Sequence, residues 1–329
     1  MKVLLTGGAG YIGSHAVREF LAAGHEVSVI DDLSNGHRAA VPEGVRLHVG
    51  DLGDPTVLRE ALAGVGAVVH FAGVLDVGES VRLPFKYWSI NVQKGIALLA
   101  GMAEAGVRKI IFSSTCATYG IPLRVPIDET HPQEPINPYG QSKRAFERAL
   151  KDLADAGVLR AVALRYFNAA GCHPDGSLGE DHDPEIHLIP LAIDAALGRR
   201  PSLTVFGDDY DTPDGTGIRD YIHVQDLGSA HVQALAALES GDAFRFYNLG
   251  TETGHSVREV LAAVEQVAGV KVPAVIGPRR AGDPPRLVAS AEKIRRELGF
   301  RPRHAGLHGI VETALRWRRE HPKGYGKGH

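Results

Sequence analysis

Short apolar runs alternate with stretches of helical periodicity along the first half of the chain. The run "KVLLT" at 2–6 predicts a buried strand, and "YIGSHAVREFLAAG" at 11–24 has apolar residues at helical spacing. The same reading predicts strands at 26–30, 45–50, 67–73, 109–114 and 161–167, and helices at 95–106 and 142–157. Strands that alternate with helices predict βαβ units, and hence an α/β fold in which a parallel sheet carries helices on both faces.

The pattern becomes looser after about residue 172. A long polar loop is expected at 172–187, followed by shorter elements at 188–198, 202–207, 257–269 and 308–320. At ~100–200 residues per domain, 329 residues suggest two domains. We therefore expect one domain over 1–172 and a smaller α/β domain mainly over 173–329, with some later segments returning to the first domain.

Composition and charge exclude several classes of function. The net charge is −3 and there is no basic block, which disfavours binding to nucleic acid or to a membrane surface through bulk charge. Cys116 and Cys172 cannot make a disulfide framework, and no apolar run approaches the ~18 residues of a membrane span. The sixteen histidines are scattered without zinc-ligand spacing. We expect a soluble cytoplasmic protein without a metal.

A glycine-rich segment, "TGGAGYIG" at 6–13, joins the first predicted strand to the first helix. Gly7, Gly10 and Gly13 would allow a tight turn and let the backbone approach a diphosphate, which the N–H groups at the helix start can bind. Asp31 ends the second predicted strand, where a carboxylate accepts hydrogen bonds from ribose hydroxyls and repels a 2′-phosphate. This pattern favours NAD over NADP. The alternative is a structural glycine turn beside a solvated acidic loop.

Two further signals are weaker when each is taken alone. Asp51 and Leu52 follow the third predicted strand and could flank an adenine, although an ordinary strand-end turn explains them too. Tyr139 and Lys143 lie four residues apart in "NPYGQSK", so they share one face of a helix. That spacing suits a tyrosine base with a lysine partner, but it also suits two polar residues on a solvated helix.

The combination of motifs resembles the extended short-chain dehydrogenase/reductase family. It rests on "TGGAGYIGSH", "FSSTCATYG" at 112–120, "NPYGQSK" at 137–143 and "LRYFNAAG" at 164–171. The stretches at 206–227, 247–250 and 279–285 are similar to the branch of this family that epimerises UDP-hexoses. The resemblance implies a Rossmann-type doubly wound sheet with a smaller substrate domain, bound NAD, a UDP-sugar substrate and a homodimer.

The resemblance also implies a reaction and its catalytic residues. Tyr139, helped by Thr115, would take the proton of the sugar 4-hydroxyl while the C4 hydride moves to NAD⁺; the 4-keto sugar would then turn and receive the hydride on its other face. UDP-glucose and UDP-galactose would thereby be interconverted. Lys143 and the oxidised nicotinamide are expected to lower the pKa of Tyr139.

Other reactions of the family stay open as alternatives. Dehydratases carry a carboxylate just after the position of Thr115, where this chain has Cys116 and Ala117, so elimination of water lacks its acid. Epimerisation of another UDP-sugar, such as UDP-N-acetylglucosamine or UDP-xylose, is a closer alternative. A non-catalytic NAD-binding module is disfavoured because Tyr139 and Lys143 are both present.

The resemblance assigns further contacts residue by residue. Those to the cofactor are expected from Gly7, Gly10, Tyr11, Ile12, Gly13, Asp31, Asp32, Asn35, Asp51, Leu52, Phe71, Ala72, Gly73, Asn91, Ser113, Tyr139, Lys143 and Tyr166. Those to the substrate are expected from Thr115, Tyr139, Phe167, Asn168, His187, Leu188, Phe206, Arg219, Tyr221, Arg280, Asp283 and Leu287. Helix capping is the alternative for Asn91, and surface ion pairs are the alternative for the arginines.

Three positions depart from the pattern of the family or leave a choice. Leu75 stands where relatives carry a lysine that reaches the cofactor phosphates, and His187 where some relatives have asparagine. Leu287 matches a position that gates space beside the sugar, although a slip of one residue would put Arg286 there.

Glu180, Asp181, His182 and His187 could bind a metal, but a polar lid over the nucleotide is the preferred interpretation.

Overall fold

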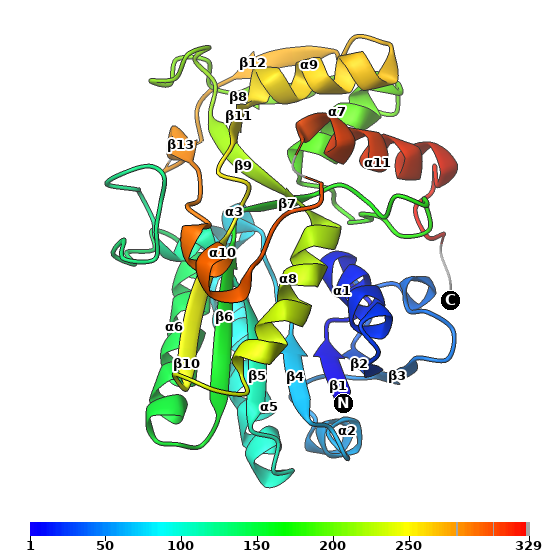
Figure 1. Cartoon of the computed structure of the whole chain (residues 1–329). Helices are drawn as coiled ribbons and strands as arrows, with labels where there is room; N and C mark the ends of the chain where they lie inside the picture. The colour runs from blue at the N-terminus through cyan, green and yellow to red at the C-terminus, as the bar shows by residue number, and fades with distance from the viewer. Residues whose placement is uncertain (281, 305, 327–329) are drawn as a thin grey trace.

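A parallel sheet of seven strands forms the centre of the larger part of the molecule (Figure 1). The computed structural model describes residues 1–280, 282–304 and 306–326. The strand order is β10-β6-β5-β4-β1-β2-β3, and every neighbouring pair is parallel. The strands are β1 (Lys2–Thr6), β2 (Glu26–Asp31), β3 (Arg46–Val49), β4 (Ala67–His70), β5 (Lys109–Thr115), β6 (Arg160–Tyr166) and β10 (Phe244–Leu249).

Helices cover both faces of this sheet, because alternate residues of each strand point to opposite sides. Val3 and Leu5 of β1 pack on one face against α1 (Tyr11–Ala22), α8 (Val224–Ala237) and α10 (Glu292–Leu298). Leu4 packs on the other face against α2 (Pro55–Ala61), α5 (Lys94–Glu104) and α6 (Pro138–Asp155). Helices α1 and α8 lie side by side in Figure 1. The expected α/β fold with a doubly wound Rossmann-type sheet is confirmed.

A smaller part, at the top of Figure 1, is built from short strands and three helices. Strands β7 (Asn168–Ala170), β11 (Gly254–Ser256) and β13 (Arg286–Leu287) pair with β9 (Ile218–His223), and β8 (Leu203–Phe206) pairs with β12 (Ala274–Gly277). Helices α7 (Leu188–Ala196), α9 (Val257–Ala268) and α11 (Leu307–Glu320) bury a separate core that includes Ile193, Val260 and Trp317.

Five short helical segments complete the described structure. They are η1 (Arg38–Ala40), α3 (Val77–Arg82), α4 (Pro84–Tyr87), the π-helical turn η2 (Trp88–Gln93) and η3 (Cys116–Thr118). Among the described residues, no helix combines the length and the apolar character that crossing a bilayer requires.

The direction of strand order changes between β1 and β4, and this placement determines where a ligand can bind. From β1 the chain builds the sheet towards β2 and β3, whereas β4, β5 and β6 extend it the other way. The chain therefore leaves β1 and β4 towards opposite ends of the sheet, and open α/β sheets bind ligands in the crevice outside the carboxyl ends of the strands at such a switch point. Strand β10 adds a seventh strand beyond the six predicted within 1–172.

Candidate active site

The glycine loop after β1 is held against the loop after β4. Gly7 has a φ of +69°, and a Cβ atom there would lie 2.6 Å from the backbone nitrogen of Ala72. A Cβ on Gly13 would lie 2.1 Å from the carbonyl oxygen of Gly7. Gly10 caps α1 without a side-chain hydrogen bond, so the N–H groups of the first turn, which begins with Tyr11 and Ile12, have no capping side chain as their acceptor. This cradle fits the diphosphate of a dinucleotide.

Asp31 is buried, whereas Asp32 and Asn35 in the loop that follows it are exposed. Asp31 is buried at the end of β2, where its Oδ2 accepts the N–H of Ala9 and its Oδ1 the N–H of Leu33, both at 2.9 Å. Burial raises the pKa of this carboxyl group. Asp32 is exposed and accepts the N–H of Ser34 at 3.0 Å, and Asn35 is exposed in the same turn. Asp31 is therefore the carboxylate held beside the glycine loop.

The predicted cofactor residues after β3 and β4 form the other side of the crevice. Asp51 pairs with Lys94, Leu52 is buried, and Phe71, Ala72 and Gly73 follow β4 directly. Asn91 is buried inside η2, where its Oδ1 accepts the N–H of Val74 at 2.9 Å and its Nδ2 donates to Ser142 Oγ at 3.0 Å. Asn91 therefore does not cap a helix; it joins the loop after β4 to α6. Leu75 is exposed in that loop.

Tyr139 and Lys143 lie on the first turns of α6. The helix begins at Pro138, and the Asn137 side chain accepts the N–H of Gly140 at 2.9 Å, which is a capping arrangement. Lys143 is buried and its Nζ donates to the carbonyl oxygen of Ser113 at 3.0 Å. The helix face that carries the pair therefore points at the end of β5, where Ser113 and Thr115 lie.

Hydroxyl groups from β5, β6 and α6 meet at this point. Ser113 Oγ lies 2.5 Å from the hydroxyl oxygen of Tyr166, and Thr115 Oγ1 accepts the N–H of Ala117 at 3.1 Å. The structure brings Ser113, Thr115, Tyr139, Lys143 and Tyr166 together as the sequence predicts. Burial raises the pKa of Tyr166 to about 12 and that of Cys116 to about 12, so neither is an anion near neutral pH.

Burial changes the pKa values of both members of the tyrosine–lysine pair. It lowers the pKa of Lys143 from 10.5 to about 8, and the negative charge of Glu147 opposes this fall. Burial raises the pKa of Tyr139 well above 10, and a hydrogen bond with Thr115 offsets only part of the rise. Among the protein groups around Tyr139, desolvation therefore has the largest effect, and the lowering expected from Lys143 together with an oxidised nicotinamide stays a prediction.

The structure reveals one functional neighbour that the motif search missed. Glu147 follows Lys143 by one helical turn and is buried, with only 4% of its side chain exposed. Its carboxylate accepts hydrogen bonds from Arg165 Nη2 at 2.6 Å, from Ser114 Oγ at 2.5 Å and from Gln133 Nε2 at 3.0 Å. The four-residue spacing that relates Tyr139 to Lys143 also relates Lys143 to Glu147, and this was the available sequence signal.

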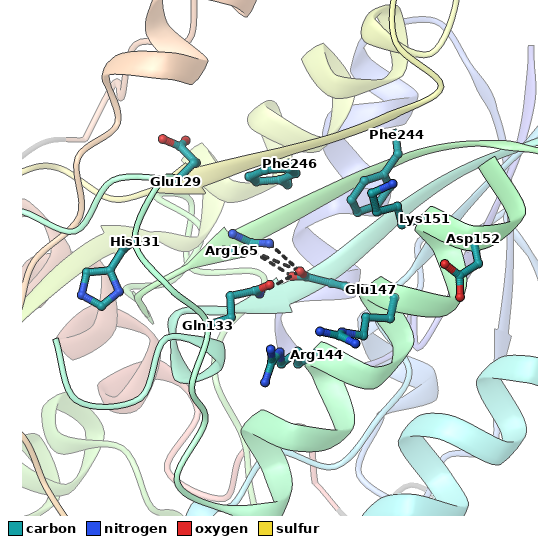
Figure 2. A pocket seen from close by; sticks show the side chains of 11 residues that line it. Glu129, His131, Gln133, Arg144, Glu147, Lys151, Asp152, Arg165, Phe244 and Phe246 are labelled. Atoms are coloured by element: carbon teal, nitrogen blue, oxygen red, sulfur yellow. Dashed lines mark hydrogen bonds and ion pairs between the residues drawn. The ribbon is translucent and has the colours of Figure 1, made fainter. Parts of the chain in front are cut away.

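A hollow of about 470 Å³ lies on the far side of this ion pair (Figure 2). Figure 2 shows Arg165 and Gln133 pointing toward Glu147, with His131, Arg144 and Lys151 around the rim. None of the predicted cofactor or substrate residues lines it. This hollow lies behind the catalytic helix face and is separate from the candidate active site.

The predicted nucleotide-binding residues gather in the smaller part. Arg219 Nη2 lies 2.5 Å from Asp283 Oδ1, and the guanidinium of Arg280 lies 4.0 Å from the centre of the Phe206 ring. A cleft of about 390 Å³ is lined by Arg280 and Asp283 together with Ile121, Tyr210, Arg279, Gly282, Pro284 and Pro285. An arginine beside an aromatic ring, with a second arginine near the same cleft through Asp283, suits a nucleoside diphosphate. Arg219 does make an ion pair, as the alternative for the arginines has it, and Arg279 makes another with Asp209.

The residues predicted beside the sugar join the two parts of the molecule. Asn168 on β7 pairs with Tyr221 on β9, and Arg219 pairs with Leu287 on β13. Leu287 packs against a buried cluster of Tyr119, Ile127, Phe167 and Ala289, next to Cys116, whereas Arg286 is exposed. Of the two adjacent residues, Leu287 is thus the one that faces the predicted sugar side.

His187 and Leu188 lie where the polar loop enters α7. His187 is the residue before the helix, and Leu188 packs on the core of the smaller part. His187 Nδ1 lies 2.5 Å from Glu180 Oε1, so the ring faces a polar cluster in its own loop. Asp181 points elsewhere, because its Oδ2 accepts the N–H of Tyr325 at 2.9 Å.

Comparisons with known proteins agree with this geometry. The NAD dependent epimerase/dehydratase family matches residues 3–250. The chain is 48% identical over 328 residues to UDP-glucose 4-epimerase of Lacticaseibacillus casei, covering 99% of each. It resembles the crystal structure of UDP-glucose 4-epimerase from Brucella ovis in complex with NAD, with a TM-score of 0.92, 47% identity and coverage of 95% and 97%.

A third relative has a nucleotide sugar in its crystal structure. It is UDP-glucose-4-epimerase from Stenotrophomonas maltophila with bound NAD and formylated UDP-arabinopyranose. The TM-score is 0.94 at 40% identity, and the match covers 98% of this chain and 99% of that one.

Proposed function

The chain belongs to the NAD-dependent epimerase/dehydratase family, and from that membership we propose that it binds NAD and interconverts UDP-glucose and UDP-galactose at C4. The single observation that carries this proposal is the meeting of Tyr139, Lys143 and Thr115 at the crevice edge, with no carboxylate among residues 113–118. A proton acceptor and a cation are present there, whereas an acid for eliminating water is not. The enzyme is therefore an isomerase.

The residues around the crevice fit NAD. We propose that the N–H groups at the start of α1 hold its diphosphate and that the Asp31 carboxylate accepts the hydroxyls of the adenosine ribose. Lys143, which Ser113 positions, would bind the nicotinamide ribose. When bound, NAD⁺ supplies positive charge at the nicotinamide, takes the C4 hydrogen of the sugar and returns it to the opposite face.

Tyr139 is proposed to take the proton of the sugar 4-hydroxyl group. Because burial raises its pKa, its anion forms only where positive charge is close, and Lys143 lies one turn further along the same helix face. Thr115 has a hydroxyl that both donates and accepts, so it can orient the proton between the sugar and Tyr139. Ser113 and Tyr166 form a fixed hydroxyl pair beside them.

The smaller part is proposed to bind UDP. Arg219 and Arg280 would hold the diphosphate, Phe206 would contact the uracil, and Asp283 would accept the uridine ribose hydroxyls through the oxygen that is not paired with Arg219. Residues 1–172, with β10 and α8, would then be the NAD-binding domain, and residues 173–329 mainly the nucleotide-sugar domain.

A homodimer is proposed from exposed apolar side chains on adjoining elements. Val81, Phe85 and Trp88 lie on α3, α4 and η2, Leu83 lies between α3 and α4, and the Phe85 residue is 83% exposed. Such a patch is typical of a protein–protein contact. The two free cysteines are those of a protein from a reducing compartment, which supports the cytoplasm as its location.

One assay separates the candidate functions. The purified chain is incubated with UDP-galactose without added NAD, and the products are separated. UDP-glucose is the product of the proposed epimerase, a 4-keto-6-deoxy sugar would indicate a dehydratase, and unchanged UDP-galactose would indicate a binding module.

A further inference from the structure

Two glutamates and two histidines of the polar loop converge on one point. One ligand atom each from Glu180, His182, Glu185 and His187 lies within 4.8 Å of all the others. The four residues occupy only eight positions, immediately before α7. Sequence spacing placed Asp181 among the candidates, but the chain turns Asp181 towards Tyr325 and brings in Glu185 instead.

The separations between these atoms match a tetrahedral ion better than they match a set of hydrogen bonds. His182 Nδ1 lies 3.3 Å from Glu180 Oε1 and 3.7 Å from Glu185 Oε1, and His187 Nδ1 lies 3.5 Å from Glu185 Oε1. Ligand atoms around a tetrahedral ion with bonds of ~2.0–2.2 Å are ~3.3 Å apart. Only the 2.5 Å separation between His187 Nδ1 and Glu180 Oε1 would have to widen, by about 0.8 Å.

His182 gives an independent sign that the cluster binds a ligand. Its Nδ1 atom is buried and, within the described residues, has no partner with hydrogen-bond geometry. A buried polar atom without a partner is costly, and native proteins usually provide one. This nitrogen lies 3.3 Å from an oxygen of Glu180 and 3.7 Å from one of Glu185, so a cation among these three atoms would give it a partner.

The charges of the cluster also call for a cation. The Glu180 side chain is only 5% exposed, and the described residues offer its carboxylate no arginine, lysine or backbone N–H, only the two imidazoles. Glu185 has Arg318 Nη2 at 2.9 Å from its Oε2, and its Oε1 accepts the N–H groups of Ile186 at 2.9 Å and His187 at 3.0 Å, so the charge of Glu185 is compensated and that of Glu180 is the one that needs a cation. Buried carboxylates are stable when they are paired or coordinate a metal.

We propose that Glu180, His182, Glu185 and His187 bind a divalent transition-metal ion, with Zn²⁺ as the first candidate. Two imidazole nitrogens with two carboxylate oxygens suit zinc, whereas Mg²⁺ and Ca²⁺ prefer sites made of oxygen alone. Four protein ligands leave no open position, which is characteristic of a structural site.

The ion would fix the loop between the cofactor side and the smaller domain. The His182 ring lies edge-on to Tyr11, the first residue of α1, with 6.0 Å between ring centres. Arg318 of α11 orients Glu185 from the other side, as outer partners of metal ligands commonly do. Coordination through Nδ1 would also place the remaining His187 proton on Nε2, so that this nitrogen could donate a hydrogen bond.

The first test measures metal content directly. The full-length chain, freed of any affinity tag, is produced with zinc, dialysed against metal-free buffer and analysed by mass spectrometry of its elements. About one ion per chain is expected, as for other structural zinc sites. Glu180→Gln and His182→Asn should each lose it, whereas the control His173→Asn, which alters an imidazole of the same loop that pairs with Asp175, should keep it.

A second measurement does not depend on how the variants fold. The wild-type chain loaded with Co²⁺ should show the intense visible absorption of tetrahedral cobalt, and Zn²⁺ should abolish it. A zinc-loaded wild-type chain that retains less than roughly a tenth of an ion and gives no cobalt spectrum would overturn the proposal. Equal metal content in wild type and in both ligand variants would overturn it too. Both readouts are independent of epimerase activity.

Discussion

The Nζ atom of Lys143 donates a hydrogen bond of 3.0 Å to the carbonyl oxygen of Ser113, so α6 is joined to the end of β5. The bond holds Lys143 at Ser113, which precedes Thr115 by two residues on β5. It also places Tyr139, one turn earlier on α6, beside Thr115. A cation, a phenol and a hydroxyl are thus held by a helix and a strand of the core. Rigid elements of this kind position catalytic groups more accurately than loops do.

Removing the Tyr139 hydroxyl should abolish most of the activity but not binding. Tyr139→Phe keeps the ring and its packing, and the loss of a general base typically lowers kcat by ~10²–10⁴-fold. The dissociation constant for UDP should stay close to that of wild type. Near-normal kcat in this variant would show that another group takes the proton.

Thr115 is expected to act through its hydroxyl group. Thr115→Ser keeps the hydroxyl and should retain most of the turnover, whereas Thr115→Val should lower kcat. Valine also leaves the N–H of Ala117 without its acceptor, which costs about 1–3 kcal/mol of stability, so both variants are assayed well below their unfolding temperatures. If serine and valine give the same kcat, the proposed proton relay is wrong.

The pH dependence should report the charge of Lys143. Its pKa is about 8, so the charged form is lost, and kcat falls, as the pH rises through that value. Glu147 raises this pKa; Glu147→Gln therefore lowers it further and should move the alkaline fall of kcat to lower pH.

A neighbour in the same hollow serves as the control for Glu147. Asp152 is exposed and also lines the hollow of Figure 2, but lies further from Lys143 along α6. Asp152→Asn should leave the pH profile unchanged. An alkaline fall that stays in place in Glu147→Gln, or that moves to higher pH, would show that Glu147 does not act on Lys143.

Leu287 is predicted to gate the size of the sugar. Leucine leaves more space than tyrosine but offers no partner for an N-acetyl amide, and an unpaired buried amide costs ~1–3 kcal/mol. We expect UDP-glucose and UDP-galactose to be preferred, with weaker turnover of UDP-N-acetylglucosamine. Leu287→Tyr should abolish the weaker activity and spare the main one, as measured by kcat/KM for both sugars.

The adjacent residue provides a matched control for this prediction. Arg286 is exposed while Leu287 packs near Phe167, so Arg286→Tyr should leave the ratio of the two kcat/KM values unchanged. An unchanged ratio in Leu287→Tyr would mean that Leu287 does not gate the pocket.

The sequence predicts the local features well and the distant pairings poorly. The inner strands β1, β2, β4, β5 and β6 are largely buried apolar runs, so their pattern is visible in the chain. Tyr139 and Lys143 are related by helical spacing alone. Strand β10 could not be placed beside β6 in this way, because 78 residues separate the ends at Phe244 and Tyr166 and no local signal records the pairing. The two- and three-residue strands β13 and β7 are too short to show a period.

In the candidate site too, features that are local in the sequence are predictable, and contacts between distant residues are not. The Arg219–Asp283 ion pair joins residues 64 positions apart, and only a family resemblance could associate them beforehand. The motif indicates charge near Tyr139 but cannot show the burial of its ring, which raises the pKa of its hydroxyl group. Glu147 was overlooked because its role depends on Arg165, which comes from a different strand.

The central claim, that the chain epimerises C4 by removing and returning the same hydrogen, is tested most directly with UDP-galactose deuterated at C4. The purified chain, whose bound NAD is first verified by absorbance after denaturation, is incubated with this substrate without added cofactor. The account predicts UDP-glucose that still carries deuterium at C4. UDP-glucose in which solvent hydrogen has replaced the deuterium, or no product from NAD-containing enzyme, would contradict it.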